Sequence, residues 1–374
     1  MNMEIAREAF AKGNLQKADL CCRLILTKEP DSKEAQALIE DIRERLGLGS
    51  GISVASHPRY LLIKAWGFGF WSDLDHVLGS LLVAELTGRI PLVYWGRNSL
   101  FRDEGTDNAF VSFFRPVSDA SWQDITRPGQ SYFPPKWHVD NLQVEDLAKW
   151  EGIGARQTGL YLLGRSEDVV VSDFHTKIND LMPWIPAHSA FHGLPREAIY
   201  RALVQKYIRV QPDIAQAVAD TWNRHMARDN WLAVHVRGTD KIHEMGDLHA
   251  VNHAYHARIA RILEVNPMLR IFLLTDSVQV VAEFQQRWGD KVFTLDCQRG
   301  TSTTGVHLEG HPGTELGKQV LVDALLASRC DFFLGNGGSN VSTGIQHLKN
   351  WQAGTFFLIG PDFLGQIDLS LHDW

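Results

Sequence analysis

The chain has 374 residues and a net charge of −7, with 44% hydrophobic and 22% charged residues. This length and composition favour a globular protein of two main domains and argue against a general nucleic-acid binder. No run of about 18 apolar residues occurs, no signal-peptide core opens the chain, and the four cysteines form no CxxC pair, so we expect a cytoplasmic protein with reduced thiols and no membrane span.

Residues 1–46 are predicted to be helical. Gly13, Ala18 and Pro30 lie between apolar periodic runs, at spacings that resemble one tetratricopeptide repeat; a plain helical hairpin is the alternative. The packing positions of such a repeat would be Ala6, Ala9, Cys22 and Ile25. Because one repeat cannot bury its apolar face alone, the segment must dock on the rest of the chain, on a protein partner or on a second copy.

A linker at 47–58 precedes residues 59–194, which we interpret as an N-terminal Rossmann-like domain. Its start has the pattern of a strand, a glycine turn, a helix and a second strand. The expected elements are a strand over 60–66, a turn at Gly67–Gly69, a helix over 75–87, a strand over 90–95, loops and short helices over 97–156, and strands over 160–163 and 168–171.

Residues 195–374 are interpreted as a second Rossmann-like domain, because strands alternate with helices as in a doubly wound parallel sheet. Helical patterns cover 195–226, 250–263, 278–288, 315–328 and 341–348, and strand patterns cover 232–237, 271–275, 292–295, 331–334 and 356–359. Ligands of such sheets bind outside the carboxyl ends of the strands.

Three of these strand ends carry residues suited to a nucleoside diphosphate. Arg237 offers a fork that matches phosphate oxygens, although a salt bridge between the domains is the alternative. Glycines at 335–338 precede a helix whose N-terminal N–H groups favour an anion. The other candidates at these ends are His235, Lys241, Asp276, Gly338, Ser339 and Asn340.

The stretch 235–241, HVRGTDK, resembles the HxRRxDK motif of the fucosyltransferase superfamily, which includes α-1,6-fucosyltransferases, bacterial nodulation fucosyltransferases and protein O-fucosyltransferases. Residues 273–276, 320–331 and 339–341 resemble its later motifs, and the Gly67–Gly69 turn resembles its N-terminal glycine loop. The resemblance implies a GT-B fold, in which two Rossmann-like domains face a cleft. It also implies a GDP-sugar as co-substrate, inversion at the anomeric carbon, and no metal or other cofactor.

The resemblance also implies roles for single residues. Arg237 would hold the donor phosphates and assist the departure of GDP, and His235 would contact the donor. Asp276 would contact the nucleoside, and Asp323 the guanine or ribose side of the pocket. Ser339 and Asn340 would bond the phosphates. On the acceptor side the implied residues are Gly67, Gly69, Asp73 and His76.

One position departs from the motif: Gly238 stands where the family has a second arginine. The phosphate site therefore lacks one positive charge, which leaves the donor sugar open. Lys241 is the obvious substitute.

An attacking hydroxyl needs a general base, and we rank Glu244 first because it follows the Arg237 strand. The other candidates are Asp247, Asp73, Asp75 and His76. Two metal-site patterns, Asp73-Leu-Asp75 and the histidines at 249, 253 and 256, are better explained by a helix first turn and a polar helix face.

The sequence thus favours an inverting, metal-independent glycosyltransferase that moves a sugar, possibly fucose, to a glycan, lipid-linked or protein acceptor. The alternative is a catalytically silent GT-B scaffold acting through its N-terminal helices. A dehydrogenase is disfavoured because no G-x-G-x-x-G turn with a following acidic residue is present.

Overall fold

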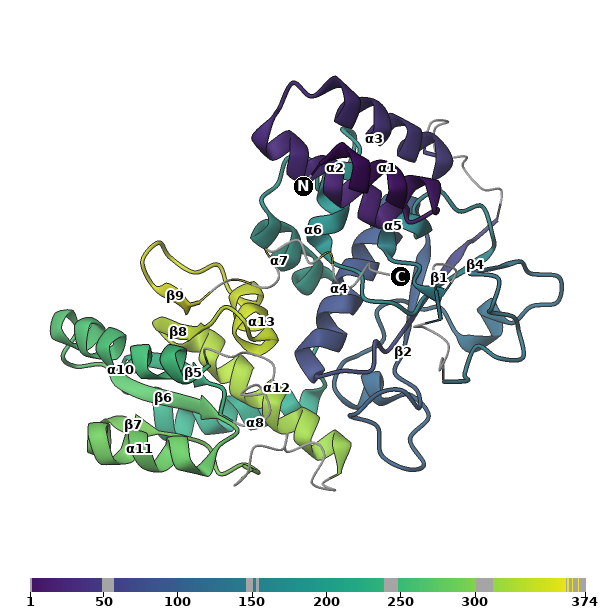
Figure 1. Ribbon diagram of the computed structural model, residues 1–374. Coiled ribbons are helices and arrows are strands. Elements are labelled where there is room, and N and C mark those ends of the chain that lie inside the picture. Colours follow the sequence, from purple (N-terminus) through teal and green to yellow (C-terminus); the bar gives the residue numbers. More distant parts are fainter. Residues whose placement is uncertain are drawn as a thin grey trace.

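The computed structural model describes residues 2–48, 57–145, 151–152, 155–238, 248–300, 312–360, 362, 365 and 369, with the side chains of 248–253 left aside. Three N-terminal helices lie against the first of two α/β units (Figure 1). Each unit contains one parallel sheet. No helix within these ranges is long and apolar enough to cross a membrane.

The N-terminal segment consists of α1 (Met3–Ala11), α2 (Leu15–Lys28) and α3 (Lys33–Arg45). Asn2 and Asn14 cap the first two helices by accepting hydrogen bonds from backbone N–H groups of their first turns. The predicted packing positions are buried: Ala6, Ala9, Cys22 and Ile25. The helices are therefore present as expected, while their identity as a tetratricopeptide repeat stays a prediction.

These helices dock on the first unit of the chain. Gln16 of α2 accepts a hydrogen bond from the Thr158 hydroxyl (2.8 Å), and its backbone N–H donates to the Tyr161 hydroxyl (3.1 Å). The Trp184 indole donates to buried Asp19 (3.4 Å). The apolar face of the segment is thus covered by the body of the same chain.

The first sheet has the strand order β2–β1–β4–β3 and is parallel throughout. Its strands are β1 (Tyr60–Lys64), β2 (Ile90–Tyr94), β3 (Tyr132–Phe133) and β4 (Val169–Ser172). Helix α4 (Phe70–Thr87) connects β1 to β2 and is buried along almost its whole length. Short helices complete the unit: η1 (Ala109–Ser112), η2 (Trp122–Ile125), α5 (Gly159–Leu162), α6 (Ile178–Leu181) and η4 (Met182–Trp184).

The strand predicted over 160–163 is wrong, because these residues belong to the single helical turn α5. All four residues of α5 are buried, and Gly159 fits directly against Thr176, where a Cβ atom would lie 2.4 Å from the threonine methyl. A buried apolar run of four residues has no periodicity that separates a strand from a helical turn.

The second sheet is also parallel, with the order β7–β6–β5–β8–β9. Its strands are β5 (Trp231–Val236), β6 (Arg270–Thr275), β7 (Val292–Phe293), β8 (Phe332–Asn336) and β9 (Phe356–Ile359). The helices are α10 (Leu248–Val265), α11 (Val278–Trp288), η6 (Gly289–Lys291), α12 (Gly313–Arg329) and α13 (Asn340–Leu348). Strand β5 is central and fully buried, as its apolar run predicts.

The two units meet along α4, α7 (Arg196–Tyr207) and α13, while α8 (Pro212–Thr221) packs on α12 and continues into the π-helix η5 (Trp222–Met226) (Figure 1). Gly344 of α13 lies directly on Trp71 of α4, where an added Cβ would be 2.2 Å from the indole ring. Helix α7 touches both units, so the domain boundary near 195 stays a prediction.

Candidate functional site

The carboxyl ends of β5, β6 and β8 lie at one edge of the second sheet. The register pairs Val236 with Thr275 and Val234 with Leu334, so the residues that follow these strands emerge side by side. This is the edge at which doubly wound sheets bind ligands. The predicted candidates His235, Arg237, Asp276 and Ser339 are all placed here.

His235 is buried and linked to the helix that follows β8. The Asn336 backbone N–H donates to the Ser342 hydroxyl oxygen (3.1 Å), and that hydroxyl lies 2.8 Å from His235 Nδ1. Burial, with the nearby charge of Arg237, lowers the pKa of His235 to about 3. The imidazole is therefore neutral, and its Nδ1 is engaged by the Ser342 hydroxyl.

Arg237 is paired with Asp276 across the β5–β6 edge. Its Nε lies 3.1 Å from Asp276 Oδ2, and the Gly238 N–H donates to Oδ1 of the same carboxylate (2.8 Å). About a quarter of the Arg237 side chain, 24%, stays exposed. Asp276, predicted to contact the nucleoside, thus forms an ion pair with Arg237 and accepts a hydrogen bond from the Gly238 N–H.

Gly238 has no room for a side chain in this arrangement. A Cβ atom there would lie 2.6 Å from Ser277 Cβ and 3.3 Å from a Val280 methyl group. An arginine, which the motif has at this position, therefore does not fit on this backbone. Only glycine leaves enough space for the start of α11, which packs against position 238.

The turn between β8 and α13 is tightly folded. Gly338 donates its N–H to Asn336 Oδ1 (2.8 Å), and Ser339 is the N-cap of α13 with no side-chain capping bond. Ser339 is buried, whereas Asn340 is partly exposed. The first-turn N–H groups of a helix have no intrahelical partner and form an anion site together with the helix dipole.

Asp323 of α12 lies near Arg299, which bonds the ends of β6 and β7. The Arg299 guanidinium donates to the Thr275 carbonyl (3.2 Å) and the Leu295 carbonyl (2.6 Å). Burial raises the pKa of Asp323 to about 7 against the opposing charge of Arg299. Within the described residues, Asp323 Oδ1 is buried without a hydrogen-bond partner. Arg299 was not predicted, because no motif or strand pattern marks its position.

The predicted acceptor-side residues adjoin the first sheet. Asp73 Oδ1 accepts from the N–H groups of Gly67 (2.8 Å) and Phe68 (3.3 Å), and Gly69 is the N-cap of α4. His76 is fully buried: Thr176 N–H donates to its Nδ1 (3.1 Å), and its Nε2 faces the Ser172 carbonyl (3.3 Å). These hydrogen bonds hold the glycine loop and β4 in place, and a role toward an acceptor stays a prediction.

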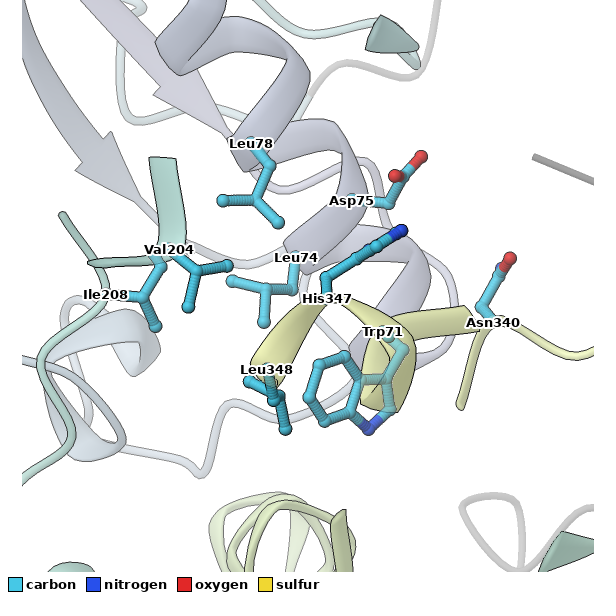
Figure 2. A pocket seen from close by; sticks show the side chains of 10 residues that line it. Trp71, Leu74, Asp75, Leu78, Val204, Ile208, Asn340, His347 and Leu348 are labelled. Atoms are coloured by element: carbon cyan, nitrogen blue, oxygen red, sulfur yellow. The ribbon is translucent and has the colours of Figure 1, made fainter. Parts of the chain in front are cut away.

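A cluster of polar side chains between the units was only partly predicted. Asp75 accepts from Tyr200 (2.5 Å) and lies 2.9 Å from His175 Nε2. The His347 ring stacks on Tyr200, with centroids 3.7 Å apart, and burial lowers its pKa to about 3. Asp75 and His347 line a small cavity together with Asn340 (Figure 2).

The metal alternatives find no support among the described residues, which contain no group of three or more possible ligands. Asp73 and Asp75 bond different partners, and both His256 nitrogens are engaged, by Glu283 (2.6 Å) and Trp288 (3.2 Å). Lys241, Glu244 and Asp247, together with the side chains of His249 and His253, lie outside the described residues.

No protein-family model matches the chain, and no curated protein matches it. Among solved structures, the chain is similar to the NodZ α-1,6-fucosyltransferase soaked with GDP-fucose, with a TM-score of 0.53 and 20% identity over 78% of this chain and 92% of that chain. The fucosyltransferase NodZ from Bradyrhizobium gives a TM-score of 0.51 at 20% identity with the same coverage.

A mutant of FUT1 from Arabidopsis thaliana in complex with GDP is similar at a TM-score of 0.50 and 13% identity, over 87% of this chain and 76% of that chain. The likeness extends over both parallel-sheet units. It confirms the expected fold: the chain has the GT-B architecture seen in these fucosyltransferases.

Proposed function

We propose that the protein is an inverting, metal-independent glycosyltransferase that transfers a sugar, possibly fucose, from a GDP-sugar. The observation that carries the proposal is the convergence at one sheet edge of Arg237, the β8–α13 glycine turn and the N-terminus of α13. The similar NodZ and FUT1 structures, obtained with GDP-fucose and with GDP, support the choice of nucleotide.

The chemistry requires stabilisation of a departing diphosphate. As the bond to the anomeric carbon breaks, negative charge builds on the β-phosphate, and preorganised donors there supply most of the rate enhancement. Arg237 is held by Asp276 with part of its guanidinium exposed. The α13 N-terminus adds backbone N–H groups, with Ser339 and Asn340 beside them.

Recognition of the nucleoside falls to the groups around that edge. His235 is neutral and its Nδ1 is engaged by Ser342, so its Nε2 can form one directional hydrogen bond without adding charge. Asp323 has an unbonded buried oxygen, which a guanine N–H or a ribose hydroxyl would satisfy. These two residues would set the choice of base, whereas Arg237 would bind any nucleoside diphosphate.

The acceptor, which is a glycan, a lipid-linked precursor or a protein, would bind at the first sheet. The free state of all four cysteines agrees with a reducing location, and the cytoplasm stays the expected one.

A catalytically silent scaffold is the second candidate, and Gly238 is the observation that favours it. The hydrogen bond of Gly238 goes to the carboxylate of Asp276, so this contact does not restore the missing positive charge. A scaffold would bind GDP without releasing GDP from a GDP-sugar.

Thermal unfolding with GDP, UDP, ADP and NAD, each with EDTA and with Mn²⁺, tests the proposal. A ligand at 100 times its dissociation constant stabilises by about 2.7 kcal/mol, which raises Tm by about 5–10 °C for domains of this size. The expected result is a GDP-selective shift that survives EDTA and is lost in Arg237→Ala. Arg270→Ala, at the opposite end of β6, is the matched control and keeps the shift. No shift with any nucleotide contradicts the donor site.

A further inference from the structure

A histidine–carboxylate pair lies at the carboxyl edge of the first sheet. His175 follows the end of β4 by three residues, and its Nε2 is 2.9 Å from Asp75 Oδ2. The Trp66 ring, beyond the end of β1, stacks on the imidazole at a centroid distance of 5.6 Å and an angle of 18°. The pair therefore occupies the edge of this sheet where a ligand is expected.

Asp75 is ionised although it is buried. Burial alone would raise its pKa, but the hydrogen bonds from His175 and Tyr200 and the charge of His175 outweigh that effect and lower the pKa below its usual value. The Tyr200 hydroxyl bonds Asp75, and the His347 ring stacks on the Tyr200 ring and holds it in place. The carboxylate thus has a permanent partner on Oδ1 and the imidazole on Oδ2.

This arrangement selects one tautomer of His175. Because an ionised carboxylate only accepts, the imidazole donates Nε2–H to Asp75, and in the neutral form of the ring Nδ1 then carries the lone pair. None of the described residues hydrogen-bonds Nδ1, and 10% of the side chain stays exposed. The exposed Phe68 ring lies against Trp66, so an apolar surface adjoins the basic nitrogen.

The pair also lies close to the predicted phosphate site. Asp75 and Asn340 line the same small cavity, and in Figure 2 their polar ends lie on the same side of it. Asn340 is the first residue of α13, at whose N-terminus the diphosphate would bind. The cavity therefore extends from Asp75, which holds His175, to the first residue of α13.

We propose that His175 is the general base of the sugar transfer and that Asp75 is its positioning residue; the assignment rests on the proposed function and specifies its acceptor half. Nδ1 takes the proton of the acceptor hydroxyl while the oxygen forms its bond to the anomeric carbon. The bond from that carbon to the β-phosphate oxygen breaks, and its electron pair leaves with GDP. Asp75 stabilises the imidazolium that results, as an orienting carboxylate does in nucleophile–base pairs.

The test uses the full chain and water as the acceptor, with GDP release from GDP-fucose as the readout. GDP binding is measured first by thermal shift, so that a failed donor site is recognised separately. His175→Ala is expected to bind GDP as the wild type does and to release GDP about 10²- to 10⁴-fold more slowly. Imidazole added to this variant restores part of the rate. His188→Gln, an exposed histidine of the same unit, is the matched control and keeps the wild-type rate.

The pH profile separates a base from a structural residue. A general base acts in its unprotonated form, so the wild-type rate is expected to fall toward acid pH. This limb is absent in His175→Ala and in His175→Gln, which preserves a donor to Asp75. Charged or titratable groups that face the pair are Tyr200 and Arg196 of α7, His347 of α13 and Asp180 of α6. Tyr200→Phe lowers the rate but keeps the acid limb.

Three results would overturn the assignment while leaving GDP binding intact. In the first, His175→Gln has the rate and pH profile of the wild type. In the second, His175→Ala is slow but imidazole does not restore its rate. In the third, the wild-type protein binds GDP but never releases GDP from GDP-fucose. Failure of the wild type to bind GDP contradicts the proposed function itself.

Discussion

The substitution Gly238→Arg would restore the second arginine of the HxRRxDK motif. We predict that this substitution destabilises the protein. Any side chain at position 238 places a Cβ atom 2.6 Å from Ser277 Cβ, and Cβ contacts this short are essentially never found in proteins. The strand end or α11 must shift. Overpacking of this kind costs about 1–3 kcal/mol, which lowers Tm by roughly 2–12 °C for domains of 150–250 residues.

The shift would also weaken the donor site. The Gly238 N–H bonds Asp276 Oδ1, and Oδ2 of the same carboxylate holds Arg237, so movement of residue 238 displaces the guanidinium. Gly238→Arg should therefore bind GDP more weakly than the wild type, despite its additional positive charge. Thermal unfolding and a GDP titration by calorimetry measure both effects.

Two companion variants identify the cause. Gly238→Ala adds the Cβ without the charge and should lose nearly the same stability as Gly238→Arg. Ser277→Gly removes the opposing Cβ and the capping side chain of α11, at a cost of about a few tenths of a kcal/mol. In this background, a substitution at 238 should destabilise the protein less than it does in the wild type. A Gly238→Arg protein as stable as the wild type, with equal or tighter GDP binding, would refute the reasoning.

Three further predictions concern buried contacts. Ser342→Ala leaves His235 Nδ1 and the Asn336 N–H without their partner and should cost about 1–3 kcal/mol in thermal unfolding; an unchanged Tm contradicts the network. Asp323 has a folded pKa of about 7, above its ordinary value of 3.8, so the wild type should lose stability as pH rises from 4 to 7. Asp323→Asn lacks this loss, and equal slopes of Tm against pH in the two proteins would exclude the buried acid. Tyr161→Phe removes the acceptor of the Gln16 N–H and should speed hydrogen exchange of the α2 amides; exchange unchanged from the wild type argues against docking through this bond.

The second sheet was predictable because its strands are short apolar runs separated by clear helical periods. Trp231–Val236 and Arg270–Thr275 differ from the predicted ranges by one residue at each end or less. Arg237 and Asp276 could be found because each directly follows a recognisable strand, and Ser339 because it follows the glycine turn after β8. What the sequence could not show is that Asp276 bonds Arg237 and Gly238, since this depends on the register of β5 with β6.

The first unit was less predictable, and the reason is distance along the chain. Asp75 meets His175 and Tyr200, which are 100 and 125 residues away, and neither partner belongs to a motif. Asp73 and His76 look like functional residues in the sequence, yet their bonds go to the glycine loop and to Thr176. A polar residue in a first helical turn has the same spacing whether it caps a loop or faces a substrate.

Helix α13 connects the two halves of the proposed reaction. Its first residues would form the proposed phosphate site, and His347 near its end stacks on Tyr200, which holds Asp75. Gly344 between them lies on Trp71 of α4 with no space for a side chain. A shift of α13 along α4 would therefore move the phosphate site and the Tyr200 support of Asp75 together. Because both contacts are made by one short helix, donor and acceptor groups are aligned by rigid packing rather than by the loops around them.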